Sequence, residues 1–351
     1  MNRSVKNSRW LIAAGAVAAM GLSAYVVSRK TARAEADNPP QGRFIEVDGV
    51  TLHYTEHGNA QAPALVILHG MGSMGQEMLL SGLIELAESQ YRVLVFDRPG
   101  YGHSDRPVGN RYDPEGQAQL FLKALDLLGI ERPVVMSHSW ATLIALYMAK
   151  QAPSALKGLV LAGGYYTPSV RLDVLGSSVP AIPLLGPLMA RTLSPIVSRL
   201  VWPLLSWRVF SPAPRSLRRA FTREYPLWMA LRPEALRTAA QETAMLLPEA
   251  IKLSNEDLNL DVPVVLVAGK QDRLLMTNWH SARLHERLPN SRLHVVDQAG
   301  HMVHHAAPEM LLHAVREVSS LVNTDTPVDL EASTRLAPED EPYQTAAIAA
   351  R

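Results

Sequence analysis

A serine, an aspartate and a histidine, far apart in the chain, have the residue types that nucleophilic catalysis requires. Ser139 stands where a β-branched run passes directly into a helical pattern, with the small residues Ser137 and Ala141 two positions to either side. A strand that turns into a helix within one or two residues must bend sharply, and small neighbours let the two elements lie almost in contact. Asp272 and His301 each follow a later apolar run. Attack by a serine hydroxyl needs a base to take its proton and a carboxylate to orient that base, so these three side chains could together cleave an acyl bond.

The bend contains two serines, and the flanking residues choose between them. Ser139 is favoured because it has the apolar run before it, the helical pattern after it and a small residue at the required spacing on each side. The usual form of this bend, G-x-S-x-G, has glycine at both flanking positions. Here Ser137 and Ala141 replace the glycines, so the match is weak by itself and depends on the rest of the chain.

Apolar runs alternate with helical patterns on both sides of the bend, which predicts an α/β fold with a mostly parallel sheet flanked by helices. The runs that predict buried strands are residues 64–68, 91–96, 133–137, 159–162, 262–268 and 292–296. Residues 43–57 alternate apolar and polar side chains around Asp48-Gly49, which predicts an antiparallel hairpin and brings the sheet to eight strands. Catalytic groups in such sheets gather at the carboxyl ends of strands, and Ser139, Asp272 and His301 all follow strands.

Residues 165–260 interrupt this alternation, since they contain many prolines and several helical patterns but no convincing strand. They predict a helical cap inserted between strands six and seven. Pairs such as Ile196/Val197 and Leu200/Val201 form an apolar helical face, which Pro203 should kink. This face either packs over the core or, with the arginines around it, suits an interface with anionic lipid.

Taken together, these residues resemble the α/β-hydrolase superfamily, specifically its capped, serine-nucleophile members of the AB hydrolase-1 type. The resemblance covers roughly residues 43–321. It implies that Ser139 is the nucleophile, that His301 is the general base and then the acid, and that Asp272 orients the histidine. His301 is followed by His304 and His305, but no acidic cluster accompanies them in the sequence, so no metal site is expected.

The resemblance also implies an oxyanion hole made of two backbone N–H groups. One belongs to Trp140, directly after the nucleophile, and the other to Met71, directly after His69-Gly70. His69, Gly70 and Trp140 are accordingly expected to line the substrate site. The segment at residues 97–102 matches the family's tight turn after the fourth strand, for which a structural role is expected.

A serine nucleophile excludes some chemistries and leaves others open. Epoxide hydrolases and haloalkane dehalogenases use an aspartate at this position, so Ser139 argues against both activities. The favoured function is hydrolysis of a carboxylic ester of an apolar substrate, with lipids among the candidates, and no cofactor is required. Carbon–carbon bond hydrolysis and acyl transfer are the enzymatic alternatives. A catalytically silent ligand-binding protein is the alternative of a different class, suggested by the replaced glycines.

Composition narrows the partners. A formal net charge of +1 argues against nucleic acid as the main partner. The sequence contains no cysteine, which excludes disulfides, thiolate metal sites and a cysteine nucleophile. The oligomeric state is left open, and the expected small-molecule partner is the apolar ester.

Residues 10–27 are uncharged and rich in alanine, leucine and valine, with basic residues on both sides. As a helix this run would span roughly 27 Å, about one hydrocarbon core. The sequence therefore predicts a single-pass membrane anchor with the catalytic domain outside the cytoplasm. A cleaved signal peptide, giving a secreted or periplasmic enzyme, is the alternative.

The predicted organisation is an anchor and linker at residues 1–40, a hydrolase core at residues 41–164 and 261–323, the cap at residues 165–260 and a disordered tail at residues 324–351.

Overall fold

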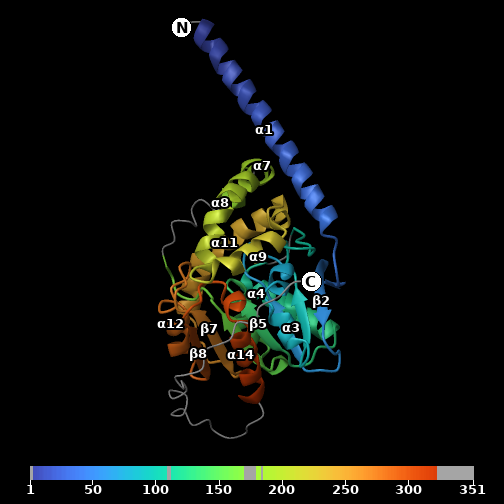
Figure 1. The fold of residues 1–351 in the computed structure, drawn as a ribbon, viewed down its shortest axis with the longest axis vertical. Coiled ribbons are helices and arrows are strands. Elements are labelled where there is room, and N and C mark those ends of the chain that lie inside the picture. Colours follow the sequence, from blue (N-terminus) through green and yellow to red (C-terminus); the bar gives the residue numbers. More distant parts are fainter. Residues whose placement is uncertain (1–2, 109–111, 170–178, 183–184, 322–351) are drawn as a thin grey trace.

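An eight-stranded sheet forms the centre of the molecule, as the computed structural model shows (Figure 1). The structure describes residues 3–108, 112–169, 179–182 and 185–321, and of residues 3–13 only the helical course. The strands are β1 (Arg43–Val47), β2 (Val50–His57), β3 (Ala64–Leu68), β4 (Arg92–Phe96), β5 (Val134–His138), β6 (Gly158–Ala162), β7 (Val264–Gly269) and β8 (Ser291–Val296).

The strand order is β1-β2-β4-β3-β5-β6-β7-β8. Pairing is parallel from β4 to β8 and antiparallel for β1 with β2 and for β2 with β4. The predicted mostly parallel, eight-stranded α/β-hydrolase sheet is therefore confirmed. The hairpin forms at its predicted turn, where Asp48 and Gly49 both have positive φ, the conformation that a two-residue hairpin turn of this kind requires.

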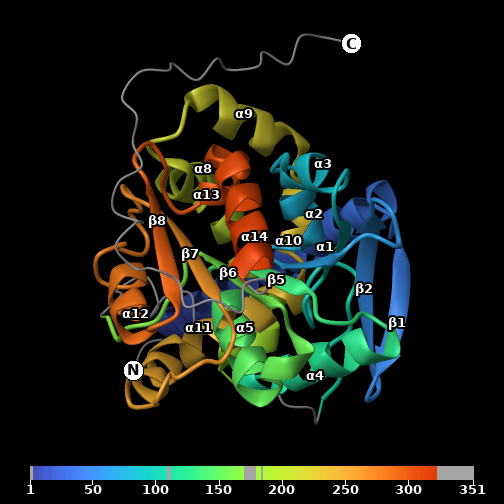
Figure 2. The same cartoon turned by 90° about the horizontal axis from the view of Figure 1, so that it is seen from below.

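Helices cover both faces of the sheet, which is why its central strands are apolar on both sides (Figure 2). In β3, Val66 and Leu68 pack toward α4 and α5, whereas Leu65 and Ile67 pack toward α3 and α14. The helices around the sheet are α2 (Gly75–Leu79), α3 (Leu83–Ala87), α4 (Pro114–Leu127), α5 (Ala141–Gln151), α12 (Ser281–Arg287), α13 (Val303–Ala306) and α14 (Pro308–Leu321).

Five α-helices of the described residues stand between β6 and β7 in the chain, and they lie together beyond one end of the sheet (Figure 1). We call them the inserted helices: α7 (Leu185–Arg191), α8 (Leu193–Phe210), α9 (Arg215–Glu224), α10 (Leu227–Ala230) and α11 (Pro233–Ser254). They fall within the segment predicted as a cap, and its status as a separate domain stays a prediction. The apolar face of α8 does not pack over the core, since Leu200 is 75% and Leu204 64% exposed.

The first helix, α1 (Arg3–Asp37), projects from the body with its first half, and its second half lies against the body (Figure 1). Val27 and Ala34 are buried there. Ser23 Oγ donates a hydrogen bond to the carbonyl oxygen of Thr192 on the inserted segment. The second half of α1 is thus bound to protein.

This arrangement corrects the prediction for residues 10–27. The predicted membrane anchor is wrong: in the part of the chain that the structure describes, no helix combines the length and the apolar character needed to cross a membrane. The physical reason is that Arg29, Lys30 and Arg33 lie within the same helix, so the described part of α1 combines apolar residues with charged ones. Two further predictions depended on the anchor, and both are wrong with it. They are the membrane as a partner through this segment and the location outside the cytoplasm. The predicted disordered tail at residues 324–351 lies outside the described residues.

The end of β4 is held by one buried carboxylate. Asp97 Oδ1 accepts the Gly75 N–H at 2.7 Å, and Asp97 Oδ2 accepts the His103 N–H at 2.9 Å and lies 2.7 Å from His53 Nδ1. Burial alone would raise the pKa of Asp97, but the hydrogen bond and charge of His53 outweigh it and the pKa lies below its usual range. The carboxylate therefore stays charged and connects β2, α2 and the turn after β4.

We expect Asp97→Asn to lower the free energy of unfolding by about 2–4 kcal/mol, because the amide presents an N–H group to donors that now face a carboxylate. Denaturant unfolding measures this change. Asp297→Asn is the matched control, since Asp297 is exposed and forms an ion pair with exposed Lys270, and it should change stability by less than about 1 kcal/mol. Equal effects of the two substitutions would contradict the role given to Asp97.

Candidate active site

The bend between β5 and α5 holds Ser139 in an unusual backbone conformation. Its φ is +55°, a value that residues other than glycine seldom adopt. Such backbone strain persists only where surrounding contacts impose it. The Ser139 N–H donates to Ala162 O at 2.9 Å, and the Ser139 carbonyl accepts from both the N–H and the hydroxyl of Thr142. The bend is thereby fastened to β6 on one side and to α5 on the other.

His301 and Asp272 lie beside this serine. His301 Nε2 is 3.1 Å from Ser139 Oγ, and His301 Nδ1 is 2.8 Å from Asp272 Oδ2. The second carboxylate oxygen of Asp272 accepts the N–H groups of Leu274 and Leu275 at 2.7 and 2.8 Å. A carboxylate at Nδ1 favours the tautomer whose Nε2 accepts the serine proton. The structure thus brings the three predicted residues into one chain of hydrogen bonds.

Ser137, the other serine of the bend, has a different environment. It lies within β5, pairs with β3 and β6 and is fully buried. Ser139 is the serine whose hydroxyl contacts His301.

The loop after β3 lies directly against the bend. A Cβ atom on Gly70 would stand 3.1 Å from Ser139 Cβ, so any side chain at this position would crowd the bend. Met71 follows Gly70, and Trp140 begins the first turn of α5, where helices have N–H groups without an intrahelical partner. Both predicted backbone donors therefore belong to the segments next to Ser139, and their role as an oxyanion hole stays a prediction.

The residues predicted to bind substrate differ in what they can offer. His69 is fully buried, and both of its ring nitrogens are engaged inside the protein, with the Arg98 N–H and the Gly70 carbonyl. Its ring therefore supports the loop after β3, and its backbone, with that of Gly70, borders the site. Trp140 is 1% exposed.

A second group of buried residues supports His301, and its central member, Glu77, is not apparent from the sequence. Glu77 Oε1 lies 2.6 Å from Nε2 of both His304 and His305, on the turn that follows His301. His138 Nε2 lies 3.0 Å from the carbonyl oxygen of His301. The histidines were visible in the sequence, but Glu77 had no signal beyond being an acidic residue in a helical stretch. Glu77 is the acidic partner of His304 and His305.

Among the described residues, two groups of side chains have ligand atoms within 4.8 Å of one another, as metal binding would require: Glu77 with His138 and His304, and His294 with His313 and Glu317. In both, a carboxylate oxygen already pairs with a histidine nitrogen. These groups are the places at which the expectation of no metal can be tested.

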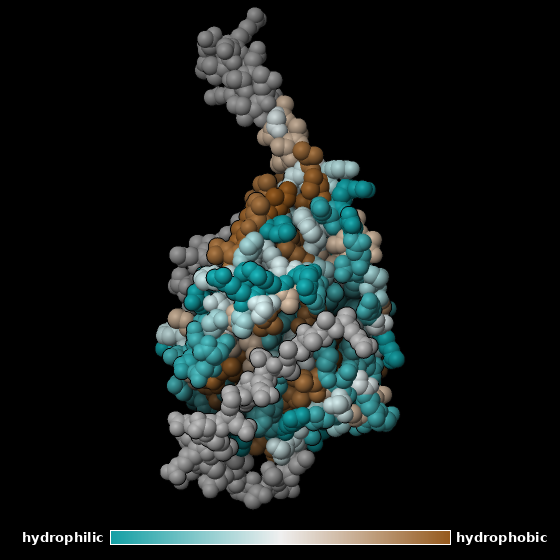
Figure 3. Space-filling view, in the orientation of Figure 1, coloured by the Kyte–Doolittle hydropathy of each residue, from teal (hydrophilic) through white to brown (hydrophobic). Residues whose placement is uncertain are grey.

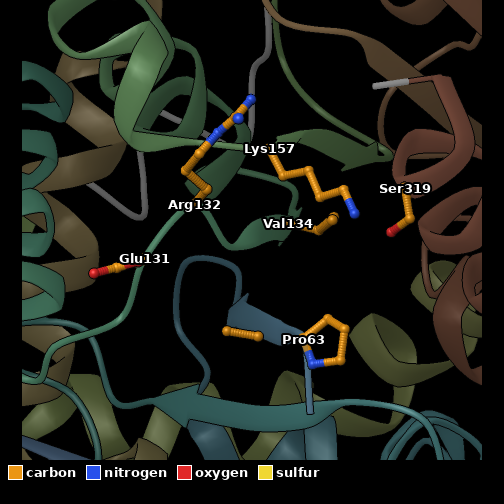
Figure 4. A pocket seen from close by; sticks show the side chains of 7 residues that line it. Pro63, Glu131, Arg132, Val134, Lys157 and Ser319 are labelled. Carbon is orange, nitrogen blue, oxygen red and sulfur yellow. The ribbon is translucent and has the colours of Figure 1, made fainter. Parts of the chain in front are cut away.

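The hollow in Figure 4 is not this site. Pro63, Arg132, Val134 and Lys157 line it, at the starts of β3, β5 and β6. Ser139, Asp272 and His301 follow the opposite, carboxyl ends of their strands.

Comparisons with known proteins agree with this fold. A family model described as the alpha/beta hydrolase family matches residues 65–314. An uncharacterized hydrolase of Bacillus subtilis (strain 168) is 26% identical over 274 residues, which cover 77% of this chain and 94% of the relative. A thermophilic esterase from Thermogutta terrifontis has a TM-score of 0.63 at 19% identity, covering 81% of this chain and 100% of that one. A membrane phospholipase A, described as a bacterial virulence factor, has a TM-score of 0.61 at 21% identity, covering 92% and 99%. These two structures share the fold.

Burial keeps His138 neutral, and this predicts a pH dependence of stability. Burial first, and then the charges of His304 and His301, hold the pKa of His138 well below its ordinary value of 6.5. Below pH 6.5 the unfolded chain therefore takes up a proton that the folded protein excludes, and stability falls as the pH falls. One such histidine contributes a slope of up to about 1.4 kcal/mol per pH unit.

We expect His138→Gln to reduce the loss of unfolding free energy between pH 7 and pH 5, measured by urea unfolding at each pH. His313→Gln, at an exposed position on α14, is the control and should keep the wild-type slope. Parallel wild-type and His138→Gln profiles would show that His138 is not the excluded proton site.

Proposed function

Because the chain belongs to the alpha/beta hydrolase family and is a hydrolase, we propose that it is a serine esterase, which cleaves a carboxylic ester through an acyl-enzyme on Ser139. One observation carries this proposal. The Ser139 hydroxyl, the His301 ring and the Asp272 carboxylate form a continuous line of contacts of 3.1 and 2.8 Å. The first distance allows a proton to pass from the Ser139 hydroxyl to His301, and the second allows Asp272 to orient the ring.

In the first half of the reaction, Ser139 Oγ attacks the ester carbonyl carbon while its proton passes to His301 Nε2. Asp272 stabilises the imidazolium that forms, because its Oδ2 accepts from Nδ1. The tetrahedral intermediate collapses when the C–O bond to the alcohol breaks, and His301 gives its proton to the leaving oxygen. In the second half, water gives a proton to His301 and attacks the acyl carbon. The bond to Ser139 Oγ then breaks, His301 returns the proton to this oxygen, and the acid is released.

The negative charge of the tetrahedral intermediate needs fixed donors. The backbone N–H groups of Met71 and Trp140 are the proposed oxyanion hole. Support comes from the close approach of Gly70 to Ser139 and from the position of Trp140 at the start of α5. Backbone donors lose no side-chain freedom when the charge develops, which makes them effective in this role.

An apolar ester is the proposed substrate class. The support is the surface of the inserted helices, where large apolar side chains on α7 and α8 are exposed (Figure 3). These residues include Leu188, Val197, Leu200, Leu204 and Trp207. Contiguous apolar surface on a soluble part of a protein commonly marks a site that contacts apolar molecules. A screen of esters with acyl chains of graded length tests this class, and equal rates for acetate and long-chain esters would contradict it.

We expect Ser139→Ala to abolish turnover of a p-nitrophenyl ester, with a loss of about 10³-fold or more in kcat, since removing one member of such a triad has an effect of that size. A fluorophosphonate probe should label the wild-type protein and not this variant. Ser137→Ala is the matched control, a serine two residues away, and it should keep most of the activity.

An inactive Ser137→Ala together with an active Ser139→Ala would show that the wrong serine has been assigned. A wild-type protein that binds esters but reacts with neither ester nor probe would favour the catalytically silent alternative. Probe labelling with release of a carbon–carbon cleavage product or of a transferred acyl group, but without ester hydrolysis, would favour the other serine chemistries.

A further inference from the structure

The carbonyl group of Gly70 is held by two donors. His69 Nδ1 lies 2.8 Å from Gly70 O, and Arg98 Nη2 lies 3.0 Å from the same oxygen. Because the Arg98 N–H donates to His69 Nε2, the ring proton must be on Nδ1, which donates to Gly70 O. Burial, and then the charge of Arg98, lower the pKa of His69 to about 4, so the ring is neutral at pH 7 and keeps this tautomer.

Fixing this carbonyl also fixes the N–H group of the next residue. In a trans peptide the C=O and the following N–H lie in one plane and point in opposite directions. The Met71 N–H therefore points away from His69 and Arg98. Gly70 itself lies against Ser139, so the proposed oxyanion donor is oriented by the bonds on the other side of its own peptide. Donors on the carbonyl also polarise the peptide, which strengthens its N–H as a donor.

Arg98 is the centre of this arrangement, and every one of its side-chain N–H groups has an acceptor. Nε donates to His69 O at 2.8 Å, and Nη1 donates to Gln117 Oε1 at 3.2 Å. One N–H group of Nη2 donates to Gly70 O. The second N–H groups of Nη1 and Nη2 donate to the two carboxylate oxygens of Glu242, at 2.5 and 3.0 Å. A planar guanidinium held at so many points has a single orientation.

Glu242 belongs to α11, one of the inserted helices, whereas Arg98 lies in the turn after strand β4. Both side chains are 0% exposed. Burial alone would raise the pKa of Glu242, but the charge of Arg98 outweighs it, and the pKa lies below its usual value. The next residue, Thr243, has its hydroxyl 3.2 Å from Met71 Sδ. Helix α11 thus contacts the loop after β3 through Arg98 and directly at Met71.

We infer that Arg98 and Glu242 are positioning residues of the oxyanion site, through which the inserted helix α11 orients the Met71 N–H. The inference rests on the proposed function. It differs from a purely structural role because the peptide that Arg98 holds is the one that would donate to the reacting oxygen.

The decisive variant is the double substitution Arg98→Met/Glu242→Leu, which removes both charges and retains side chains of similar bulk. Replacing both members of a buried ion pair with apolar residues often preserves folding, whereas removing one leaves an unpaired charge. We expect kcat for a p-nitrophenyl ester to fall about 10- to 100-fold while KM changes less than about threefold, because a misdirected donor fails mainly in the transition state. The affinity for a trifluoromethyl ketone, which forms a tetrahedral adduct, should fall in parallel with kcat.

Glu242→Gln provides a second test that keeps the shape of the side chain and lowers its hold on Arg98. It should give a smaller decrease of kcat in the same direction. Tyr101→Phe is the control, because it removes the hydrogen bonds of the Tyr101 hydroxyl with Glu242, at 2.8 Å, and with the Gly72 backbone, and leaves the contacts of the Gly70 carbonyl intact. It should keep kcat within about twofold. All assays are made well below the melting temperature of each variant.

A folded double variant, or a folded Glu242→Gln protein, with wild-type kcat and wild-type ketone affinity would overturn the inference. Equal losses in the variants and in Tyr101→Phe would reduce the cluster to a structural role and also overturn it. Failure of the proposed function gives a different pattern, because Ser139→Ala would then remain active, whereas failure of this inference alone leaves Ser139→Ala inactive.

Discussion

The bend at Ser139 is the constraint on which the rest of the structure depends. A left-handed backbone at a serine is unfavourable by itself, so β5, β6 and α5 must hold it in place. The loop after β3 lies so close to the bend that a side chain at Gly70 would crowd Ser139. Parallel pairing then brings the ends of β7 and β8 to the same edge of the sheet, where Asp272 and His301 reach the serine. The chemistry proposed here follows from that edge.

Buried charges fix the loops around the bend, and each charge links elements that are distant in sequence. Glu77 on α2 holds the turn after His301 through His304 and His305. Arg98 holds the loop after β3 and is itself held by Glu242 on α11. Such groups are costly to bury, so each requires full pairing, and full pairing leaves little freedom of orientation. The base, through the turn that follows it, and the proposed oxyanion donor at Met71 are thereby supported by buried charged groups and not by apolar packing alone.

The sequence was sufficient for the sheet and for the residues that follow its strands. Apolar, β-branched runs marked β3 to β7, and Asp48-Gly49 marked the hairpin turn, because local chemistry decides both features. Ser139, Asp272 and His301 were found because each directly follows a strand, and parallel strands end at one edge. Between β3 and β4 the chain forms two short helices, α2 and α3, and Gly82, whose φ is +80°, directly precedes the second of them.

What the sequence could not provide were the partners of buried charges. Nothing local distinguishes Glu77 or Glu242 from an exposed glutamate on a helix, since only the tertiary fold pairs them with His304 and Arg98. The membrane anchor was wrong for a related reason. The apolar run at residues 10–27 was read as a unit, but the helix that carries it continues to Asp37, and its second half packs against the inserted helices. Hydropathy within a window does not reveal where a helix ends or what it contacts.

The central claim is that Ser139 carries the acyl group during turnover, and intact-protein mass spectrometry tests it most directly. The protein is mixed with excess p-nitrophenyl ester, quenched in acid within the first turnover, weighed and then digested to locate the modified residue. The account predicts a mass increase of one acyl group on the peptide that contains Ser137 and Ser139, with fragment ions assigning it to Ser139. Turnover of the ester without an acyl adduct in the quenched wild-type protein, or an adduct on any other residue, would contradict it.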